Sequence, residues 1–170
     1  MQLFQRRRWI CPDRVAEGLE AFVAQLDWID THTGLSMAGW RAEGHPGGLA
    51  AEPGAILATT TYHDHGWFLE EVSRLQSLRN YGPVNEATAT LTVGVDTFER
   101  WDAPMHLPSC WTLGDPMFRQ DTGPDAEIPH IATWSNVEGG EGHVTWFPDE
   151  DKTPAAVRSG VRTERWRRIH

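Results

Sequence analysis

The order of the periodic segments constrains the fold of this 170-residue chain more than any single motif does. Two segments with apolar residues at helical spacing come first, over residues 14–30 and 66–80. Asp13 is expected to cap the first helix, and residues 34–40 to add a short helical turn. Residues 41–54 predict a loop, and residues 55–62, which are rich in aliphatic and β-branched side chains, predict a strand.

The most regular alternation lies in residues 86–96, EATATLTVGVD, where alanine, leucine and valine alternate with threonine and glycine. This period of two predicts a half-buried strand. Further strands are predicted within residues 105–113, 130–134 and 142–147, while residues 153–168 fit either a helix or a strand. No internal repeat is evident. Helices followed by strands, rather than alternating with them, predict an α+β fold with helices packed on one face of a largely antiparallel sheet, in a single domain over residues 1–170.

The charges divide between the two ends of the chain and its middle. The net charge is −9, but residues 9–157 hold 7 of the 15 basic and 23 of the 24 acidic residues, which gives that segment a formal charge of −16. Such a surface repels nucleic acid and favours a basic protein partner. The terminal arginines, at 6–8 and between 158 and 168, are expected to neutralise nearby carboxylates. We find no secretory signal and no membrane span, which predicts a cytoplasmic protein without a membrane partner.

The stretch TTYHDHGW, residues 60–67, raises the question of a metal site. In an extended segment, His63 and His65 would project on one face about 6 to 7 Å apart, within reach of one ion. No third histidine stands at a ligand spacing. The alternative is that Asp64 or His65 caps a helix beginning near Gly66. We therefore expect a helix entrance, and keep a metal-dependent hydrolase using His63 and His65 as a rival hypothesis.

Other catalytic signatures are missing. The sequence contains neither a GxSxG element nor a phosphate-binding loop, and the glycine pairs at 47–48 and 139–140 are typical of turns. Neither a cofactor nor catalytic residues are predicted, so the chain is not expected to be an enzyme.

Surface recognition remains as the preferred function. Two segments, 96–102 and 121–150, mix carboxylates with large aromatic rings, a combination that suits anchored and electrostatically steered protein binding. The residues predicted to bind a partner are Asp96, Glu99, Trp101, Asp102, Asp121, Asp125, Glu127, Trp134, Glu138 and Glu141.

A family resemblance points the same way. The segment LDWID at 26–30 with Leu35 and Trp40, the run from Asn85 through EATATLTVGV, the segment PMHLP at 104–108 and WFP at 146–148 resemble immunity proteins of bacterial polymorphic toxin systems. The resemblance implies a non-catalytic inhibitor that binds and neutralises a cognate toxin, for instance a nuclease with a basic cleft. A phage-derived or accessory assembly protein is a further alternative.

Overall fold

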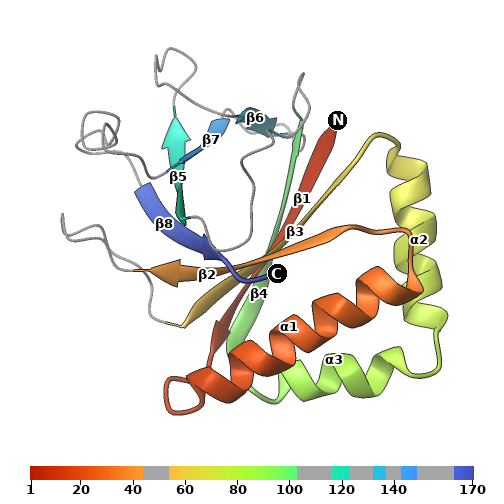
Figure 1. The fold of residues 1–170 in the computed structure, drawn as a ribbon. Coiled ribbons are helices and arrows are strands. Elements are labelled where there is room, and N and C mark those ends of the chain that lie inside the picture. Colours follow the sequence, from red (N-terminus) through yellow and green to blue (C-terminus); the bar gives the residue numbers. More distant parts are fainter. Residues whose placement is uncertain (44–53, 103–115, 123–131, 137–142, 149–162) are drawn as a thin grey trace.

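The computed structural model describes residues 1–43, 54–102, 116–122, 132–136, 143–148 and 163–170 (Figure 1). In chain order, the elements are β1 (Gln2–Ile10), α1 (Val15–His32), β2 (Met37–Glu43), β3 (Ala55–Tyr62), α2 (His65–Ser77), α3 (Tyr81–Ala89), β4 (Thr92–Asp102), β5 (Pro116–Thr122), β6 (Ala132–Asn136), β7 (His143–Pro148) and β8 (Thr163–Arg168).

The strands close into a barrel in the order β1-β3-β2-β8-β5-β7-β6-β4, and every neighbouring pair is antiparallel. The three helices gather on the side of the barrel formed by β1 to β4, away from β5, β6 and β7 (Figure 1). The predicted α+β class, with helices on one face of a largely antiparallel sheet, is therefore confirmed. Closure of the sheet leaves two distinct buried layers, one inside the barrel and one beneath the helices.

The strand order repeats within the chain, although the sequence shows no repeat. The first four strands lie in the order β4-β1-β3-β2, and the last four lie in the order β8-β5-β7-β6, which is the same order shifted by four. The pairs β2–β8 and β4–β6 join the two halves. The connections differ in length: α1 joins β1 to β2, and α2 and α3 join β3 to β4, whereas the shorter segments 123–131 and 149–162 make the corresponding connections.

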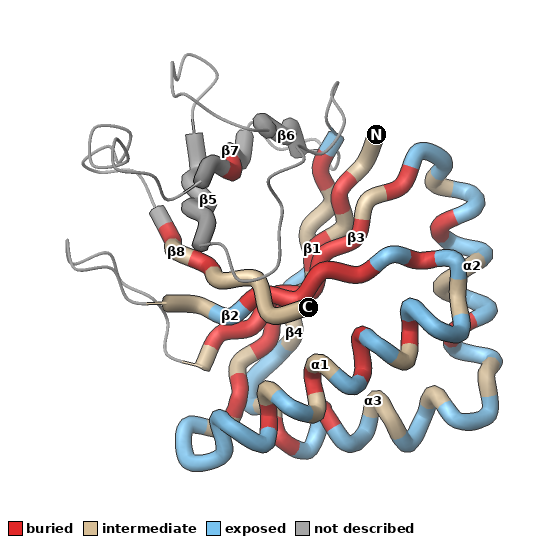
Figure 2. The backbone as a smooth tube through the Cα atoms, viewed as in Figure 1, coloured by how far each residue is buried: buried red, intermediate tan, exposed pale blue. Residues whose placement is uncertain are grey.

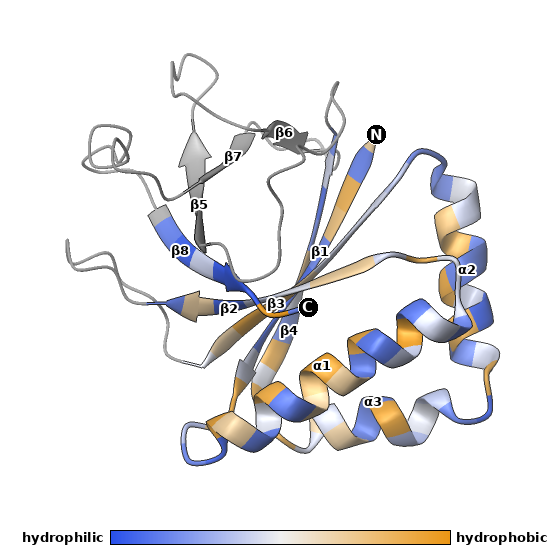
Figure 3. Ribbon diagram, viewed as in Figure 1, coloured by the Kyte–Doolittle hydropathy of each residue, from blue (hydrophilic) through white to orange (hydrophobic). Residues whose placement is uncertain are grey.

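Two apolar clusters fill the two layers. The barrel interior holds Leu3, Ala38, Leu57 and four tryptophans, while the layer beneath the helices holds mainly aliphatic and phenylalanine side chains. Strand β3 serves both, because Ala55 and Leu57 point into the barrel and Ile56 and Ala58 point to the helices. The tube in Figure 2 shows this double burial as a continuous buried stretch, and Figure 3 shows apolar residues recurring along α1 between hydrophilic ones. The tryptophans in the barrel are Trp40, Trp101, Trp146 and Trp166.

The prediction of one strand over residues 86–96 is wrong. Residues up to Ala89 belong to α3, whose inward face carries Tyr81, Asn85 and the fully buried Thr88 at helical spacing. Strand β4 starts at Thr92, and its Val93 and Val95 are exposed. Alanine and glutamate favour helix, so the alternation of alanine with threonine arose without a buried strand face.

The other local predictions had mixed outcomes. Residues 34–40 do not form a helical turn; β2 starts at Met37, and Gly39 lets α1 approach, since a Cβ there would lie 2.5 Å from a Leu26 methyl group. The strands expected within 130–134 and 142–147 correspond to β6 and β7, and the ambiguous tail contains β8. The strand expected within 105–113 lies outside the described residues. Over the described ranges, no helix combines the length and apolarity that crossing a membrane requires.

Candidate functional site

A cavity of about 410 Å³ lies between the helices and the sheet face formed by β1 to β4. Its walls are largely apolar and aromatic. Phe4 lies 5.3 Å from Phe68 and 6.0 Å from Phe98, measured between ring centroids. Phe98 is 59% exposed although it lines the cavity, which places it where the cavity meets solvent. Further apolar lining comes from Phe22, Leu26, Leu35 and Val72.

One edge of this cavity is polar and continuously hydrogen-bonded. Arg6 Nε and Arg8 Nε both donate to the Asp96 carboxylate, at 2.9 and 3.1 Å. Arg8 Nη1 donates to Gln25 Oε1 at 3.4 Å, and Gln25 Nε2 donates to Asn85 Oδ1 at 3.0 Å. All of these residues except Asp96 line the cavity. We call this set, Arg6, Arg8, Gln25, Asn85 and Asp96, the polar edge.

Local structure explains how the polar edge assembles. Alternation along β1 directs Arg6 and Arg8 toward the helices. Gln25 lies on the buried face of α1 and is 3% exposed, and Asn85 lies on the inward face of α3 one turn before Thr88. The Thr88 hydroxyl donates to the Ala21 carbonyl oxygen at 3.2 Å, which ties α3 to α1. The amides of Gln25 and Asn85 therefore meet because the two helices are fixed against each other.

The charges of the polar edge perturb one another. Burial lowers the pKa of Arg8, and the neighbouring charge of Arg6 lowers it further, while Asp96 acts in the opposite direction. Burial opposes ionisation of Asp96, but the hydrogen bonds and charges of Arg6 and Arg8 outweigh it and hold the pKa of that carboxyl below its usual range. Two guanidinium groups thus share one carboxylate, which leaves excess positive charge beside an apolar cavity.

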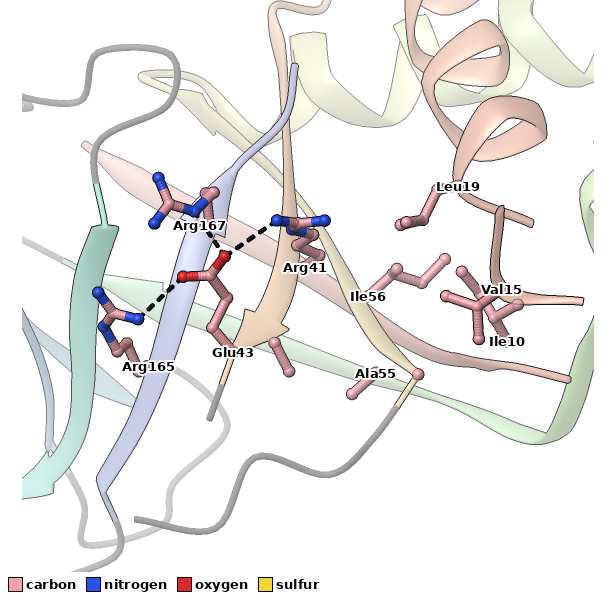
Figure 4. Close-up of a pocket in the computed structure, with 11 residues that line it drawn as sticks. Ile10, Val15, Leu19, Arg41, Glu43, Ala55, Ile56, Arg165 and Arg167 are labelled. Atoms are coloured by element: carbon pink, nitrogen blue, oxygen red, sulfur yellow. Dashed lines mark hydrogen bonds and ion pairs between the residues drawn. The ribbon is translucent and has the colours of Figure 1, made fainter. Parts of the chain in front are cut away.

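A second, more open hollow of about 500 Å³ lies at the N-terminal end of α1 and has a different character (Figure 4). Glu43 accepts hydrogen bonds there from Arg41 and Arg165, at 3.1 and 3.0 Å, and also from Arg167. Burial opposes ionisation of Glu43, but these three arginines hold the pKa of its carboxyl below its usual range. Because the Glu43 carboxylate is bound by arginines of β2 and β8, this cluster joins the two halves of the barrel. The enclosed helix–sheet cavity is therefore the better candidate for ligand binding.

Within the described ranges, the histidines of TTYHDHGW lie in different surroundings and belong to no metal-ligand cluster. Asp64 caps α2 by accepting a hydrogen bond from the Trp67 amide at 3.0 Å, as predicted. His63 is exposed, whereas His65 lies in the first turn of α2 with its Nε2 2.7 Å from Arg100 Nη1. No group of three potential metal ligands occurs among the described residues. The rival hypothesis of a hydrolase using His63 and His65 therefore has no support in the geometry.

The residues predicted to bind a partner lie in several different environments. Asp96 belongs to the polar edge, Trp101 is buried in the barrel and donates through Nε1 to Glu99 at 3.1 Å, and Asp102 is exposed at the end of β4. Asp121 lies on β5 and Trp134 on β6. The remaining four, Asp125, Glu127, Glu138 and Glu141, lie outside the described residues. Contact of these ten residues with a partner stays a prediction.

Comparison with known proteins identifies the fold. No protein family matches the chain, and no curated protein does so either. Among solved structures, the chain is similar to a proposed monooxygenase from Fusobacterium nucleatum with 8% identity and a TM-score of 0.63, covering 99% of this chain and 92% of that one. A proposed monooxygenase from Lactobacillus acidophilus gives 9% identity and a TM-score of 0.58, with 98% and 93% covered. An anthrone oxidase-like protein gives 8% identity and a TM-score of 0.55, with 99% and 91% covered.

These neighbours overturn the functional predictions. The resemblance to immunity proteins of polymorphic toxin systems is wrong, because the fold is shared over nearly the whole chain with proposed monooxygenases and an oxidase-like protein. The prediction of a non-catalytic toxin inhibitor is corrected for the same reason. The scattered tryptophan and proline positions that suggested the resemblance include Trp40 and Trp146, which fill the barrel. A buried aromatic core produced a pattern that we had assigned to recognition.

Sequence reasoning also missed the cavity residues. Gln25 and Asn85 are 60 positions apart and belong to no motif. The available signal was the polar Gln25 within the apolar stripe of the first helix, because a buried amide needs a partner.

Proposed function

We propose that this chain is an oxygenase that binds a planar, largely apolar substrate in the helix–sheet cavity. The observation that carries the proposal is the combination of aromatic walls with the hydrogen-bonded polar edge. A cavity of about 410 Å³ lies in the range of roughly 300 to 1,000 Å³ that is usual for small-molecule sites. Phe4, Phe68 and Phe98 offer ring faces and edges to an aromatic substrate.

The polar edge suits a substrate with oxygen substituents along one side. The amides of Gln25 and Asn85 offer donors and acceptors to a carbonyl or hydroxyl group. Arg8, with its excess positive charge, would stabilise negative charge that develops on a substrate oxygen when a neighbouring C–H or O–H bond loses its proton. A carbanion or phenolate formed in this way is the electron-rich species that reacts with dioxygen. The fold shared with proposed monooxygenases and an anthrone oxidase-like protein supports this reaction class.

The experiment uses dithranol, a dihydroxyanthrone, as the probe. Its ring methylene would be oxidised to a carbonyl group, consuming one dioxygen and releasing one water for each dihydroxyanthraquinone formed. Oxygen uptake and the quinone absorbance are followed with the purified full chain, against the rate without protein. We expect protein-dependent turnover with equal amounts of oxygen consumed and quinone formed.

Two matched variants locate the reaction. Val72→Trp fills the cavity from α2 and should abolish protein-dependent turnover. Val23→Trp adds the same bulk on α1 near Ile169, outside the cavity, and should leave turnover unchanged. Asn85→Ala should reduce turnover by about tenfold or more, since each lost stabilising hydrogen bond to a charged oxygen contributes roughly 1.5 to 3 kcal/mol. Equal loss in both tryptophan variants, or protein-dependent turnover that survives Val72→Trp, would contradict the proposal.

A further inference from the structure

A second polar cluster lies at the opposite end of the same sheet face, where α2 begins. Gln2 of β1 stands directly between Tyr62 of β3 and Asp102 of β4 in the strand register. Arg100 lies on the same face of β4, two residues before Asp102, and His65 opens α2 above it. The ring centroids of Tyr62 and His65 are 5.8 Å apart. Four side chains from three strands and one helix thus share a small region.

Each of these four side chains has a buried polar atom without a hydrogen-bond partner in the described part of the chain. The atoms are Gln2 Oε1, Tyr62 Oη, His65 Nδ1 and Arg100 Nε. Tyr62 as a whole is only 3% exposed. One such atom costs roughly 1 to 3 kcal/mol, and native proteins satisfy most of them. Four together indicate that the cluster binds a polar species.

The hydrogen bond between His65 and Arg100 defines the donors. Arg100 Nη1 lies 2.7 Å from His65 Nε2, and because a guanidinium only donates, Nε2 is the acceptor. With Nε2 as the acceptor, Nδ1 is the ring nitrogen that carries the N–H donor. The cluster therefore offers a ligand two N–H donors, His65 Nδ1 and Arg100 Nε, the Tyr62 hydroxyl, and Gln2 Oε1 as an acceptor.

The charge of Arg100 favours an anion. Unlike Arg6 and Arg8, it forms no ion pair with a carboxylate within the ranges that the structure describes, and its hydrogen bond goes to the His65 ring. The first turn of α2 adds a positive partial charge at His65. Asp102 is exposed, so solvent screens its opposing charge. Burial raises the pKa of the Tyr62 hydroxyl, with Arg100 acting against this shift and Asp102 with it, so Tyr62 remains a donor at neutral pH.

We propose that Gln2, Tyr62, His65 and Arg100 form a binding site for a small oxyanion that carries one O–H group, with bicarbonate as the matching size and shape. The oxyanion accepts hydrogen bonds from Tyr62, His65 and Arg100, and its O–H donates to Gln2 Oε1. Phe68 separates this site from the cavity, because it stacks on Tyr62 at 4.3 Å and also lines the cavity wall. The site does not depend on the proposed oxygenase function.

Line broadening of ¹³C-labelled bicarbonate by the full-length protein tests the site, at constant ionic strength and mildly alkaline pH. We expect saturable binding that nitrate, which is planar but has no O–H, displaces only at about tenfold higher concentration, as befits loss of one charge-assisted hydrogen bond. Formate and phosphate serve as smaller and larger competitors. Val72→Trp, which fills the cavity, should leave bicarbonate binding intact. Bicarbonate binding can therefore succeed or fail independently of the proposed oxygenase function.

Variants assign the binding to the cluster. Arg100→Gln and His65→Leu should each weaken bicarbonate binding by about tenfold or more, whereas His65→Asn keeps a donor near the position of Nδ1 and should bind within a few-fold of the natural chain. Tyr62→Phe removes only a hydroxyl without a described partner, so it should fold normally and still bind more weakly. Arg74→Gln, on the exposed side of α2, is the control. The proposal would be overturned if no saturable binding is found, or if Arg100→Gln and Tyr62→Phe bind bicarbonate as tightly as the natural chain does. Ordered water would then be the partner of these atoms.

Discussion

Arg7 and Arg8 are neighbours on β1, yet their guanidinium groups lie on opposite faces of the sheet in different surroundings. Arg7 points into the barrel, forms two hydrogen bonds with Glu164 at 2.9 and 2.7 Å, and lies 5.3 Å from the ring centre of Trp166. Arg8 points toward the helices, lines the cavity, shares Asp96 with Arg6, and donates to Gln25. Both residues are almost fully buried.

The difference separates a face of β1 that packs in the barrel core from a face that lines the candidate cavity. The Arg7–Glu164 pair is bidentate, and Trp166 Nε1 also donates to Glu164 at 3.2 Å, so these bonds lie within the core. Arg8 instead lines the cavity and donates to the Asp96 carboxylate and to the amide of Gln25, which also lines the cavity. We therefore expect changes on the barrel face to affect stability first, and changes on the helix face to affect ligand binding first.

The largest effect is expected from Glu164→Gln. Removing the carboxylate leaves the buried Arg7 cation without its partner, which should lower the free energy of unfolding by about 3 to 5 kcal/mol. Urea unfolding measures the loss. The double variant Arg7→Met with Glu164→Leu should recover most of it, because well-packed apolar side chains replace buried ion pairs at little cost. A loss below about 1 kcal/mol in the single variant would remove the distinction between the two faces.

A smaller effect is expected from Asp96→Asn on the helix face. Asp96 is partly exposed, so after allowance for solvent screening the loss should be about 1 to 2 kcal/mol. Turnover in the dithranol assay should fall by a larger factor than in a variant on the barrel face that has the same free energy of unfolding. Preserved turnover in Asp96→Asn would contradict a role for this face in binding.

Asp96 also predicts a pH dependence. Its folded pKa is lowered because Arg6 and Arg8 outweigh the opposing effect of burial. Its contribution to stability is therefore complete above the unfolded pKa of about 3.9 and is lost as the pH falls through the lower folded value. Urea midpoints measured from neutral pH down to about pH 3 should decline less in Asp96→Asn than in the natural chain.

The smallest effect is expected from Asp64→Ala. Loss of the N-cap bond to Trp67 should cost about 1 kcal/mol. Amide hydrogen exchange should speed up in the first turn of α2, which carries Phe68 of the cavity wall, and remain unchanged in β1 and β3. Uniform acceleration across the barrel would show that the two layers unfold as one unit.

The parts of the fold that local rules govern could be predicted from the sequence. The stripe of the first helix, the buried run of β3 and the Asp64 cap are each set by residues close in sequence. The expected neutralisation of terminal arginines is also found, at Asp96, Glu164 and Glu43. By contrast, the end of α3 and the start of β4 depend on contacts such as Thr88 with α1, which no local pattern reveals.

The candidate site could not be predicted, because its parts meet only in three dimensions. Arg8, Gln25 and Asn85 come from β1, α1 and α3 and have no spacing signature. The role of the barrel tryptophans could not be predicted for a related reason. A wide closed barrel requires large side chains to fill it, and the sequence does not distinguish a ring used as filling from a ring used as an anchor.

Strand β8 lies between β2 and β5, and residues 169 and 170 continue past it to bond with Gly39. The free side of β2 must therefore wait, during synthesis, for about 120 more residues, which takes on the order of ten seconds at ribosomal speed. Throughout that interval, the edge of β2 has no strand to pair with, and the tryptophan-bearing face of the sheet is uncovered. Its yield in the cell should accordingly depend on chaperones that shield growing polypeptides, more than the stability of the finished ring would suggest.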